Sequence, residues 1–234
     1  MTGTLRGLGL GPGDPELVTL KALRLLRASP VVAYPAPLGG TSFARRIVAR
    51  FLSPAQREIV ISVPMEQARF PAQSVYDEAA RRLAVELEAG RDVAMLCQGD
   101  PFFYGSFMYL FARLAERFVV EVVPGVSSLA ACAAAAQSPL AGRLDTLLVL
   151  PASLSEQQLL CRLAEVDAVA IIKLGRHFAK VKAVLDRLGL AAAARYVEHA
   201  SLASERVLPL DAVRTEDVPY FSMILLHRRG VELR

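Results

Sequence analysis

Short apolar runs alternate with amphipathic stretches through the first half of the chain. In the longer stretches, apolar residues recur every three or four positions, which is the period of a helix that packs one face on a core. Such alternation predicts a largely parallel sheet covered by helices. The predicted strands are 4–9, 31–34, 59–63, 93–97 and 119–123, and the predicted helices are 16–26, 43–51, 74–89 and 107–116.

The second half has a similar pattern after a Pro-Gly-Val segment at 124–126, which resembles a hinge. An Ala-rich helix is predicted at 128–137 and another helix at 178–188. Strands are predicted at 146–150, 169–173, 195–198 and 223–227. We therefore expect two α/β domains, an N-terminal one over 1–123 and a C-terminal one over 124–234, without internal repeats.

Composition favours a globular cytoplasmic protein. Apolar residues make up 53% of the 234 residues and charged ones 21%, which allows a sizeable core. No apolar run reaches the roughly 20 residues of a membrane span, and the first residues break on Gly and Pro before a signal-peptide core could form. The three cysteines are too few and scattered for a disulfide framework or a zinc pattern, which favours a reducing compartment.

The net charge of +4 invites a nucleic-acid interpretation. However, 23 of the 27 basic residues are arginines spread without a run, and tryptophan is absent. A nucleic-acid binder usually shows a basic stripe with aromatic platforms. Arginine also suits planar carboxylate or phosphate partners. We therefore expect a small polyanionic ligand and no nucleic acid, with a basic nucleotide- or RNA-binding module as the non-enzymatic alternative.

The glycine-rich segment 7–15 follows a strand and opens a helix, as phosphate-binding loops do. Its spacing fails, because the third glycine of a dinucleotide fingerprint would fall on Asp14 or Pro12. The Lys-Ser/Thr pair of a nucleotide-binding P-loop is missing as well, and Asp14 would repel a phosphate. Structurally, the segment predicts a tight turn in which Asp14 caps the next helix and Pro15 occupies its first position.

Two further motifs follow predicted strands. The segment 99–105, Gly-Asp-Pro-Phe-Phe-Tyr-Gly, comes after a strand that ends at Cys97, where open α/β sheets bind ligands. Its acid could hold an amine or a sulfonium, or simply shape the turn. The segment 124–128, Pro-Gly-Val-Ser-Ser, precedes the Ala-rich helix, where a serine can cap the helix or contact a ligand.

In this order and spacing, the three motifs resemble those of the tetrapyrrole methylase family, also called class III methyltransferases, over essentially the whole chain. The resemblance implies two α/β domains with the active-site cleft between them, a homodimer, and S-adenosylmethionine as methyl donor with S-adenosylhomocysteine as product. It also implies that the glycine-rich loop lies beside the cleft without gripping a pyrophosphate. The implied cofactor contacts are Pro12, Gln98, Gly99, Asp100, Phe103, Ser127, Ser128, Leu174 and Ala200.

Within the family, the segment 99–110 resembles the precorrin-2 C20-methyltransferases of cobalamin biosynthesis, especially those of the aerobic pathway. The segment 63–65, Val-Pro-Met, also suits that group. Two alternatives stay open. One is the same methylation on cobalt-factor II in the cobalt-early pathway, and a more distant one is diphthine synthase, which acts on a protein.

Methyl transfer from a sulfonium asks the protein mainly to align donor and acceptor in a dry cleft, and a base of modest strength suffices. Asp100 is the candidate for electrostatic positioning and Tyr104 for a hydrogen bond. Precorrin-2 bears eight carboxylates, so cations should line its site, although each could be an ordinary surface charge. The candidates are Arg45, Arg46, Arg50, Arg69, Lys173 and Arg176. No two of the three histidines share a helical spacing, so no metal site is predicted.

Overall fold

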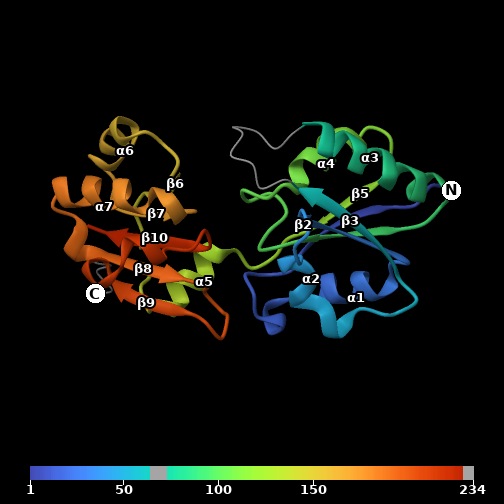
Figure 1. Ribbon diagram of the computed structural model, residues 1–234, viewed down its shortest axis with the longest axis horizontal. Coiled ribbons are helices and arrows are strands. Elements are labelled where there is room, and N and C mark those ends of the chain that lie inside the picture. The colour runs from blue at the N-terminus through green and yellow to red at the C-terminus, as the bar shows by residue number, and fades with distance from the viewer. Residues whose placement is uncertain (64–72, 229–234) are drawn as a thin grey trace. The chain divides into compact units, whose positions relative to one another are not determined.

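The computed structural model describes residues 1–63 and 73–228. The chain forms two compact units, Met1–Ser127 and Ser128–Arg234, each with its own sheet and core (Figure 1). Both units mix helices and strands, so the predicted α/β class is confirmed. Within the described residues, no helix is both long and apolar enough to cross a membrane.

The described part of the first unit contains a five-stranded parallel sheet of order β3-β2-β4-β1-β5. Because every strand points the same way, the loops that follow them emerge at one edge, here called the carboxyl edge. Strands β1 and β4 are the most buried, as expected for the centre of a covered parallel sheet. The strands are β1 (Leu5–Gly9), β2 (Val31–Pro37), β3 (Arg57–Val63), β4 (Val93–Cys97) and β5 (Val120–Val123).

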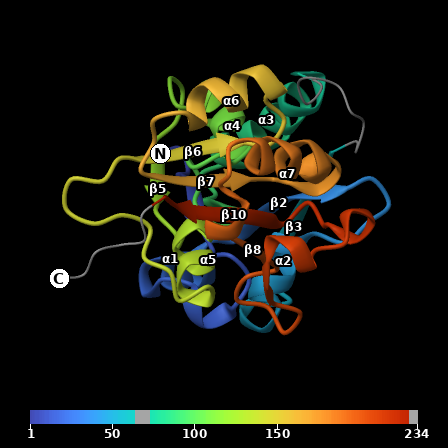
Figure 2. The same cartoon turned by 90° about the vertical axis from the view of Figure 1, so that its left-hand side faces the viewer.

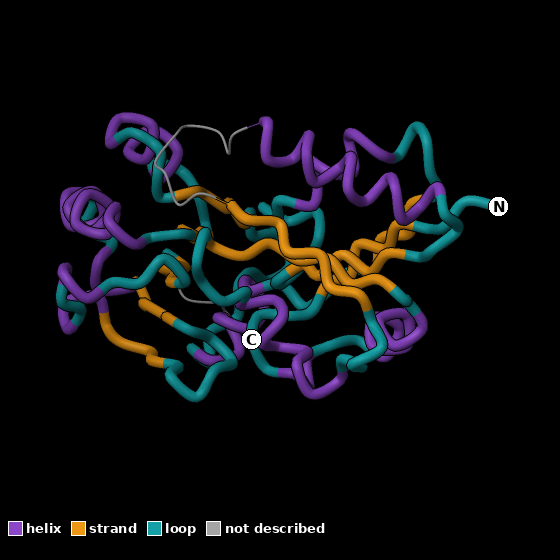
Figure 3. The backbone as a smooth tube through the Cα atoms, turned by 45° about the vertical axis from the view of Figure 1, so that its right-hand side comes forward, coloured by secondary structure: helices purple, strands orange, loops and turns teal. Residues whose placement is uncertain are grey.

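Helices cover both faces of this sheet (Figures 1 and 3). One face packs on α1 (Leu20–Ala28) and α2 (Phe43–Val48), and the other on α3 (Gln73–Glu88) and α4 (Phe107–Leu114). Successive residues of a strand face opposite ways, so β1 places Leu5 in one core and Leu8 in the other.

The first predicted helix is wrong in one respect, because it is broken. Asp14 caps a short 3₁₀ turn by accepting the N–H of Glu16 at 2.8 Å, with Pro15 at its first position, as predicted. The chain is then extended at Val18 and Thr19. The Thr19 hydroxyl accepts the N–H of Ala22 and starts α1 afresh.

The second unit contains a mixed sheet of order β6-β7-β10-β8-β9 in its described part. Strands β6 and β7 are parallel, whereas β10 lies between β7 and β8 and runs antiparallel to both. The carboxyl ends of β7 and β8 and the amino end of β10 therefore share one edge. The strands are β6 (Leu147–Pro151), β7 (Ala168–Ile172), β8 (Ala194–Glu198), β9 (Arg206–Pro209) and β10 (Ser222–His227).

Helices also cover both faces of this second sheet (Figure 2). Helices α6 (Glu156–Leu163) and α7 (Phe178–Arg187) pack into the larger core, and α5 (Ser128–Ala135) packs on the opposite face. The short 3₁₀ helices of the whole chain are η1 (Pro15–Leu17), η2 (Ala49–Phe51), η3 (Gly175–His177), η4 (Ala191–Ala193), η5 (Leu210–Ala212) and η6 (Thr215–Asp217).

Two elements of this unit were not predicted. Helix α6 begins with a capping box in which Ser155 and Gln158 exchange side-chain and backbone hydrogen bonds, so the signal Ser-x-x-Gln was present in the sequence. Strand β9 is a short, mostly exposed edge strand, and its residues therefore lack the apolar alternation that identifies a half-buried strand.

Candidate active site

The glycine-rich loop and the Gly-Asp-Pro loop are joined at the carboxyl edge of the first sheet. Strands β1 and β4 are neighbours, so the loops that follow them start side by side. The N–H of Gly11 donates to the carbonyl of Gly99 at 3.2 Å, and the N–H of Gly99 donates to the carbonyl of Gly11 at 2.7 Å. These reciprocal bonds make one rigid backbone bridge from two motifs about 90 residues apart.

The third motif packs on this bridge through Gly125. A Cβ at Gly125 would lie 2.2 Å from the carbonyl oxygen of Gly99 and 2.7 Å from the carbonyl carbon of Gly9, and a Cβ at Gly9 would lie 2.4 Å from the nitrogen of Gly125. Side chains cannot approach backbone so closely, and only glycine fits at either position. We call the resulting assembly, residues 9–12, 98–100 and 124–127, the motif cluster.

Asp100 holds the motif cluster together. Its Oδ1 accepts the N–H of Phe102 at 2.9 Å, which closes its own turn, and its Oδ2 accepts the N–H of Gly125 at 3.1 Å. Each carboxylate oxygen keeps a further lone pair for another donor. The residue expected to act on a ligand therefore also ties the second motif to the third.

Cys97, at the end of β4, is not a candidate nucleophile. Burial raises the pKa of its thiol, and the nearby Asp100 carboxylate raises it further. The thiolate is the reactive form of cysteine, so this side chain stays a small neutral core residue near neutral pH.

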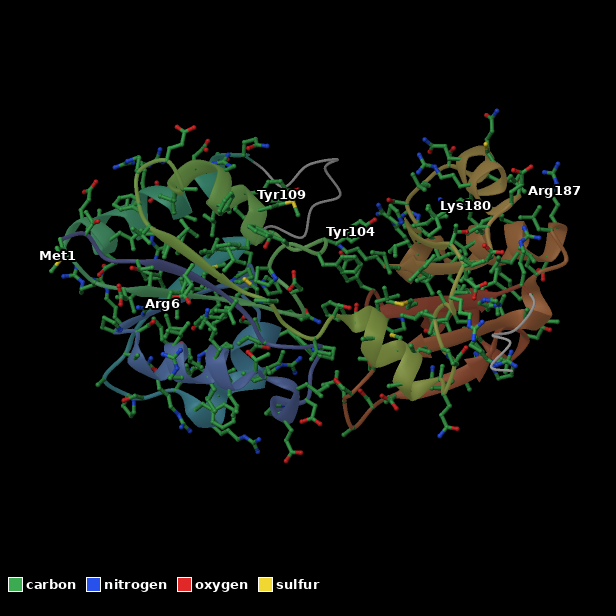
Figure 4. All side chains as sticks on the ribbon, turned by 180° about the vertical axis from the view of Figure 1, so that it is seen from behind. Met1, Arg6, Tyr104, Tyr109, Lys180 and Arg187 are labelled. Carbon is green, nitrogen blue, oxygen red and sulfur yellow. The ribbon has the colours of Figure 1, made fainter. Side chains whose placement is uncertain are left out.

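Tyr104 stands beside the motif cluster in an unusual backbone conformation. Its φ is 54°, which is uncommon outside glycine, and its side chain is exposed. The Phe103 ring meets the Tyr104 ring edge-on, with 5.2 Å between centroids. In Figure 4, Tyr104 lies at the end of the unit away from Met1. Left-handed residues outside glycine often occur at functional sites, which fits the predicted role of Tyr104.

The two cofactor candidates late in the chain share one edge of the second sheet. Leu174 follows β7 and Ala200 follows β8, and both are buried. The residues around them are left-handed: φ is 61° at Lys173, 51° at His199 and 67° at Ser201. Of the serines predicted to contact the cofactor, Ser127 is half-buried and Ser128 is the exposed first residue of α5.

The structure gives Arg45 a partner within the protein. Its Nε donates to Oε2 of Glu58 at 2.6 Å and its Nη2 to Oε1 at 2.8 Å, while the Tyr34 hydroxyl donates to the same carboxylate at 2.6 Å. Glu58 is the second residue of β3, so Arg45 reaches toward the amino edge of the sheet. The structure therefore does not bring this guanidinium to the motif cluster.

Of the other arginines of this group, Arg50 is also held apart from the motif cluster. Arg50 stacks over Phe51 at 4.8 Å, and Arg27, at the end of α1, stacks over the same ring at 5.6 Å. Because α1 ends where β2 begins, Arg50 lies at the amino edge. Arg46 is exposed and stacks over Phe43 at 5.1 Å. Arg69 lies outside the described residues.

Lys173 and Arg176 are the predicted cations that the structure places beside a candidate cofactor residue, since both flank Leu174 at the end of β7. The Lys173 ammonium lies 5.8 Å from the centroid of the Tyr220 ring, and Arg176 is exposed on η3. Burial lowers the pKa of His177 in the same turn, and the charges of Lys180 and Arg176 lower it further. The sequence analysis did not identify Tyr220. Its only sign in the sequence was that it forms an aromatic pair with Phe221 directly before an apolar strand.

The Arg45–Glu58 pair predicts an acid-sensitive contribution to stability. Hydrogen bonds from Arg45 hold the pKa of the Glu58 carboxyl at about 2, below its ordinary 4.5, although burial opposes the shift. Because the folded pKa is depressed, this stabilisation is present above about pH 5 and is lost as the pH falls toward 2. The Arg45 side chain is 40% exposed, so the contribution is at most about 1 kcal/mol.

We expect Glu58→Gln to narrow the difference between the unfolding free energies at pH 7 and pH 3, measured by urea titration. Arg45→Gln should act in the same direction, because either change removes the pair. An unchanged pH dependence in both variants would show that the pair contributes nothing.

Comparison with known proteins identifies the family. The model of the tetrapyrrole (corrin/porphyrin) methylases matches residues 4–213. Cobalamin biosynthesis protein CobIJ of Mycobacterium tuberculosis is 45% identical over 96% of this chain. The chain covers 46% of that relative, so it spans about half the length of this curated protein.

Two other relatives have nearly the same length as this chain. A precorrin-2 C(20)-methyltransferase of a Sinorhizobium species is 38% identical, over 96% of this chain and 95% of the relative. A cobalt-precorrin-2 C(20)-methyltransferase of Salmonella typhimurium is 33% identical, over 98% of both.

Solved structures share the fold. A cobalt precorrin-4 methyltransferase aligns with a TM-score of 0.77 at 26% identity, over 96% of this chain and 94% of that one. A uroporphyrin-III C-methyltransferase of Thermus thermophilus, complexed with S-adenosylhomocysteine, aligns with a TM-score of 0.69 at 28% identity, over 97% and 98%. The match over 4–213 and the relatives of nearly the same length agree with the three motifs: this chain belongs to the tetrapyrrole (corrin/porphyrin) methylase family.

Proposed function

We propose that this protein transfers a methyl group from S-adenosylmethionine to C20 of precorrin-2 in cobalamin biosynthesis. The observation that carries the proposal is the convergence of three family motifs into one backbone cluster at the carboxyl edge of a parallel sheet. Ligands of open α/β sheets bind at this edge. The names of the Sinorhizobium and Salmonella relatives support C20 as the methylated carbon.

The residues of the motif cluster fit the methyl donor better than they fit a nucleotide phosphate. Close backbone packing at Gly9 and Gly125 supplies main-chain polar groups, and a Cβ at Gly99 would meet nothing within 4 Å, which leaves room beside the loop. Asp14 and Asp100 disfavour a phosphate and suit a cationic sulfonium. We propose cofactor contacts at Pro12, Gln98, Gly99, Asp100, Phe103, Ser127, Ser128, Leu174 and Ala200.

When bound, S-adenosylmethionine supplies an activated methyl group, and the chain's own residues align it and keep water away. Asp100 sets the geometry of the loops. Tyr104, at the same edge, is proposed to form a hydrogen bond with the substrate. Lys173 and Arg176 are proposed to meet substrate carboxylates through charge-assisted bonds, and Arg46 is the remaining candidate on α2.

Binding experiments test the cofactor class. We expect isothermal calorimetry to show S-adenosylmethionine and S-adenosylhomocysteine binding at one site, without competition from NAD or ATP, because neither phosphate fingerprint is intact. Saturating ATP with magnesium serves as the control ligand. Competition by ATP would contradict the proposed use of the motif cluster.

Product analysis tests the reaction. With a ¹³C-methyl donor, mass spectrometry should show a gain of one methyl group on precorrin-2, and carbon NMR should place the label at C20. A parallel incubation with cobalt-precorrin-2 distinguishes the cobalt-free substrate, which we favour, from the cobalt-containing one in the name of the Salmonella relative. Label on another carbon would overturn the C20 assignment, and absence of label in both incubations would overturn the reaction.

We also propose that the protein acts as a homodimer in the cytoplasm without binding nucleic acid. The resemblance to the family supports the dimer, and the scattered arginines support a small anionic ligand over a nucleic acid. Light scattering on the purified chain tests the oligomeric state.

A further inference from the structure

Two aromatic side chains stand exposed at the edge of the second sheet. Tyr220 is 55% exposed and Phe221 is 43% exposed, and their rings meet edge-on with centroids 5.3 Å apart. Large apolar groups exposed side by side in this way often mark a binding surface. Neither residue belongs to the three motifs or to the cofactor contacts proposed above.

The backbone under these rings is held on both sides. The N–H of Gly175 donates to the carbonyl of Pro219 at 3.3 Å, and the N–H of Leu174 donates to the carbonyl of Ser222 at 3.4 Å. From the other neighbouring strand, the N–H of His199 donates to the carbonyl of Phe221 at 3.0 Å. The aromatic pair is therefore pinned between the two segments proposed to contact the cofactor, and it can serve as a preformed surface.

The charge beside Tyr220 indicates which ligand it suits. The Lys173 ammonium lies 5.8 Å from the Tyr220 ring centroid, within the range of a cation–π contact. Exposed Arg176 follows three residues later. A flat ring beside cations matches a large conjugated ligand with anionic groups at its rim. S-adenosylmethionine carries a cationic sulfonium, so it fits this surface less well than a tetrapyrrole polycarboxylate does.

We propose that Tyr220 is a substrate-stacking residue, whose ring packs against the macrocycle while Lys173 pairs with a carboxylate at its rim. This inference rests on the proposed function and adds a specificity-determining residue to it. Stacking needs only the ring, so the hydroxyl of Tyr220 is dispensable for it. The Lys173 ammonium adds an electrostatic contribution to substrate binding, and salt weakens that contribution.

The test measures binding of precorrin-2, prepared without oxygen, in the presence of S-adenosylhomocysteine so that no turnover occurs. We expect Tyr220→Ala to weaken this binding about tenfold, on the scale of an aromatic contact, and Tyr220→Phe to stay within about twofold of wild type. Lys173→Ala should weaken binding at low salt more than at high salt. Affinity for S-adenosylhomocysteine should stay unchanged in all three variants.

Leu147→Ala is the matched control, because Leu147 is an exposed apolar residue at the opposite edge of the same sheet. This variant should bind both precorrin-2 and S-adenosylhomocysteine with the affinity of wild type. In turnover assays, Tyr220→Ala should raise KM more than it lowers kcat, which a general loss of folding would not do.

Each other outcome has a definite meaning. If wild type binds precorrin-2 and Tyr220→Ala binds it equally well, the stacking role is wrong while the proposed function stands. A parallel loss of S-adenosylhomocysteine affinity in Tyr220→Ala would make the residue a cofactor or structural contact. If wild type binds S-adenosylhomocysteine but no precorrin-2, both the stacking role and the proposed substrate fail.

Discussion

Replacing Gly125 by alanine is expected to weaken cofactor binding by roughly a hundredfold. The new Cβ would lie 2.2 Å from the carbonyl oxygen of Gly99, and backbone on both sides leaves it no space to relax. The third motif must then move away from the other two by about an ångström, a displacement that can cost roughly a hundredfold in a positioned site. The overpacking should also destabilise the unit by about 2–3 kcal/mol. Calorimetry with S-adenosylhomocysteine and urea unfolding measure the two effects.

Gly189→Ala is the control for this experiment. Gly189 has a φ of 69° and its Cβ would meet nothing within 4 Å, so alanine there should cost only about 1–2 kcal/mol of backbone strain. Its affinity for S-adenosylhomocysteine should equal that of wild type. Normal affinity in Gly125→Ala would show that the packing of the third motif is irrelevant to the cofactor.

Replacing Asp100 by alanine is expected to lower turnover by roughly a hundredfold, because the loops lose the carboxylate that aligns them. The main-chain N–H groups of Phe102 and Gly125 lose their side-chain acceptor, at a cost to folding of about 1–3 kcal/mol each where water cannot replace it. Asp100→Asn should fall between alanine and wild type. The asparagine amide offers one acceptor oxygen, which can accept only one of the two main-chain N–H groups. Its NH₂ would face the second N–H, and two donors cannot form a hydrogen bond.

Steady-state kinetics and urea unfolding on the same preparations separate the two effects of this change. Asp145→Asn is a suitable control, since Asp145 also accepts a main-chain N–H, from Gly142 at 2.7 Å, but in the second unit and outside the proposed site. It should leave turnover unchanged. Full activity in both Asp100 variants would reduce Asp100 to an ordinary turn residue.

Local patterns were enough to predict most elements of this fold. The alternation of apolar runs with helical stretches predicted the strands from β1 to β5 within a few residues of their observed bounds, because strands inside a covered parallel sheet are largely apolar whereas the helices between them expose one polar face. Asp14 and Pro15 likewise marked a helix start from residue type alone. What these signals share is that they act within one strand or one turn.

Contacts between distant segments could not be predicted in this way. Nothing near Asp100 in the chain shows that its carboxylate accepts the N–H of Gly125, or that Gly9 and Gly125 must both be glycine so that their backbones can touch. Arg45 is a second example of a contact that its own part of the sequence does not predict. Its pairing with Glu58 depends on β3 lying beside β2, and it gives a residue expected to contact the substrate a partner within the fold.

The strand order of the second sheet and the position of its exposed aromatic pair could likewise be seen only in the tertiary structure. Strand β10 enters between β7 and β8 from the opposite direction, which places Tyr220 between the ends of two strands that precede it by some 20 to 50 residues. The residues of a strand show that it will be buried, because burial depends on their own side chains. Its neighbours, its direction and the loops it meets depend on the free energy of the whole packed unit, so only the tertiary structure shows them.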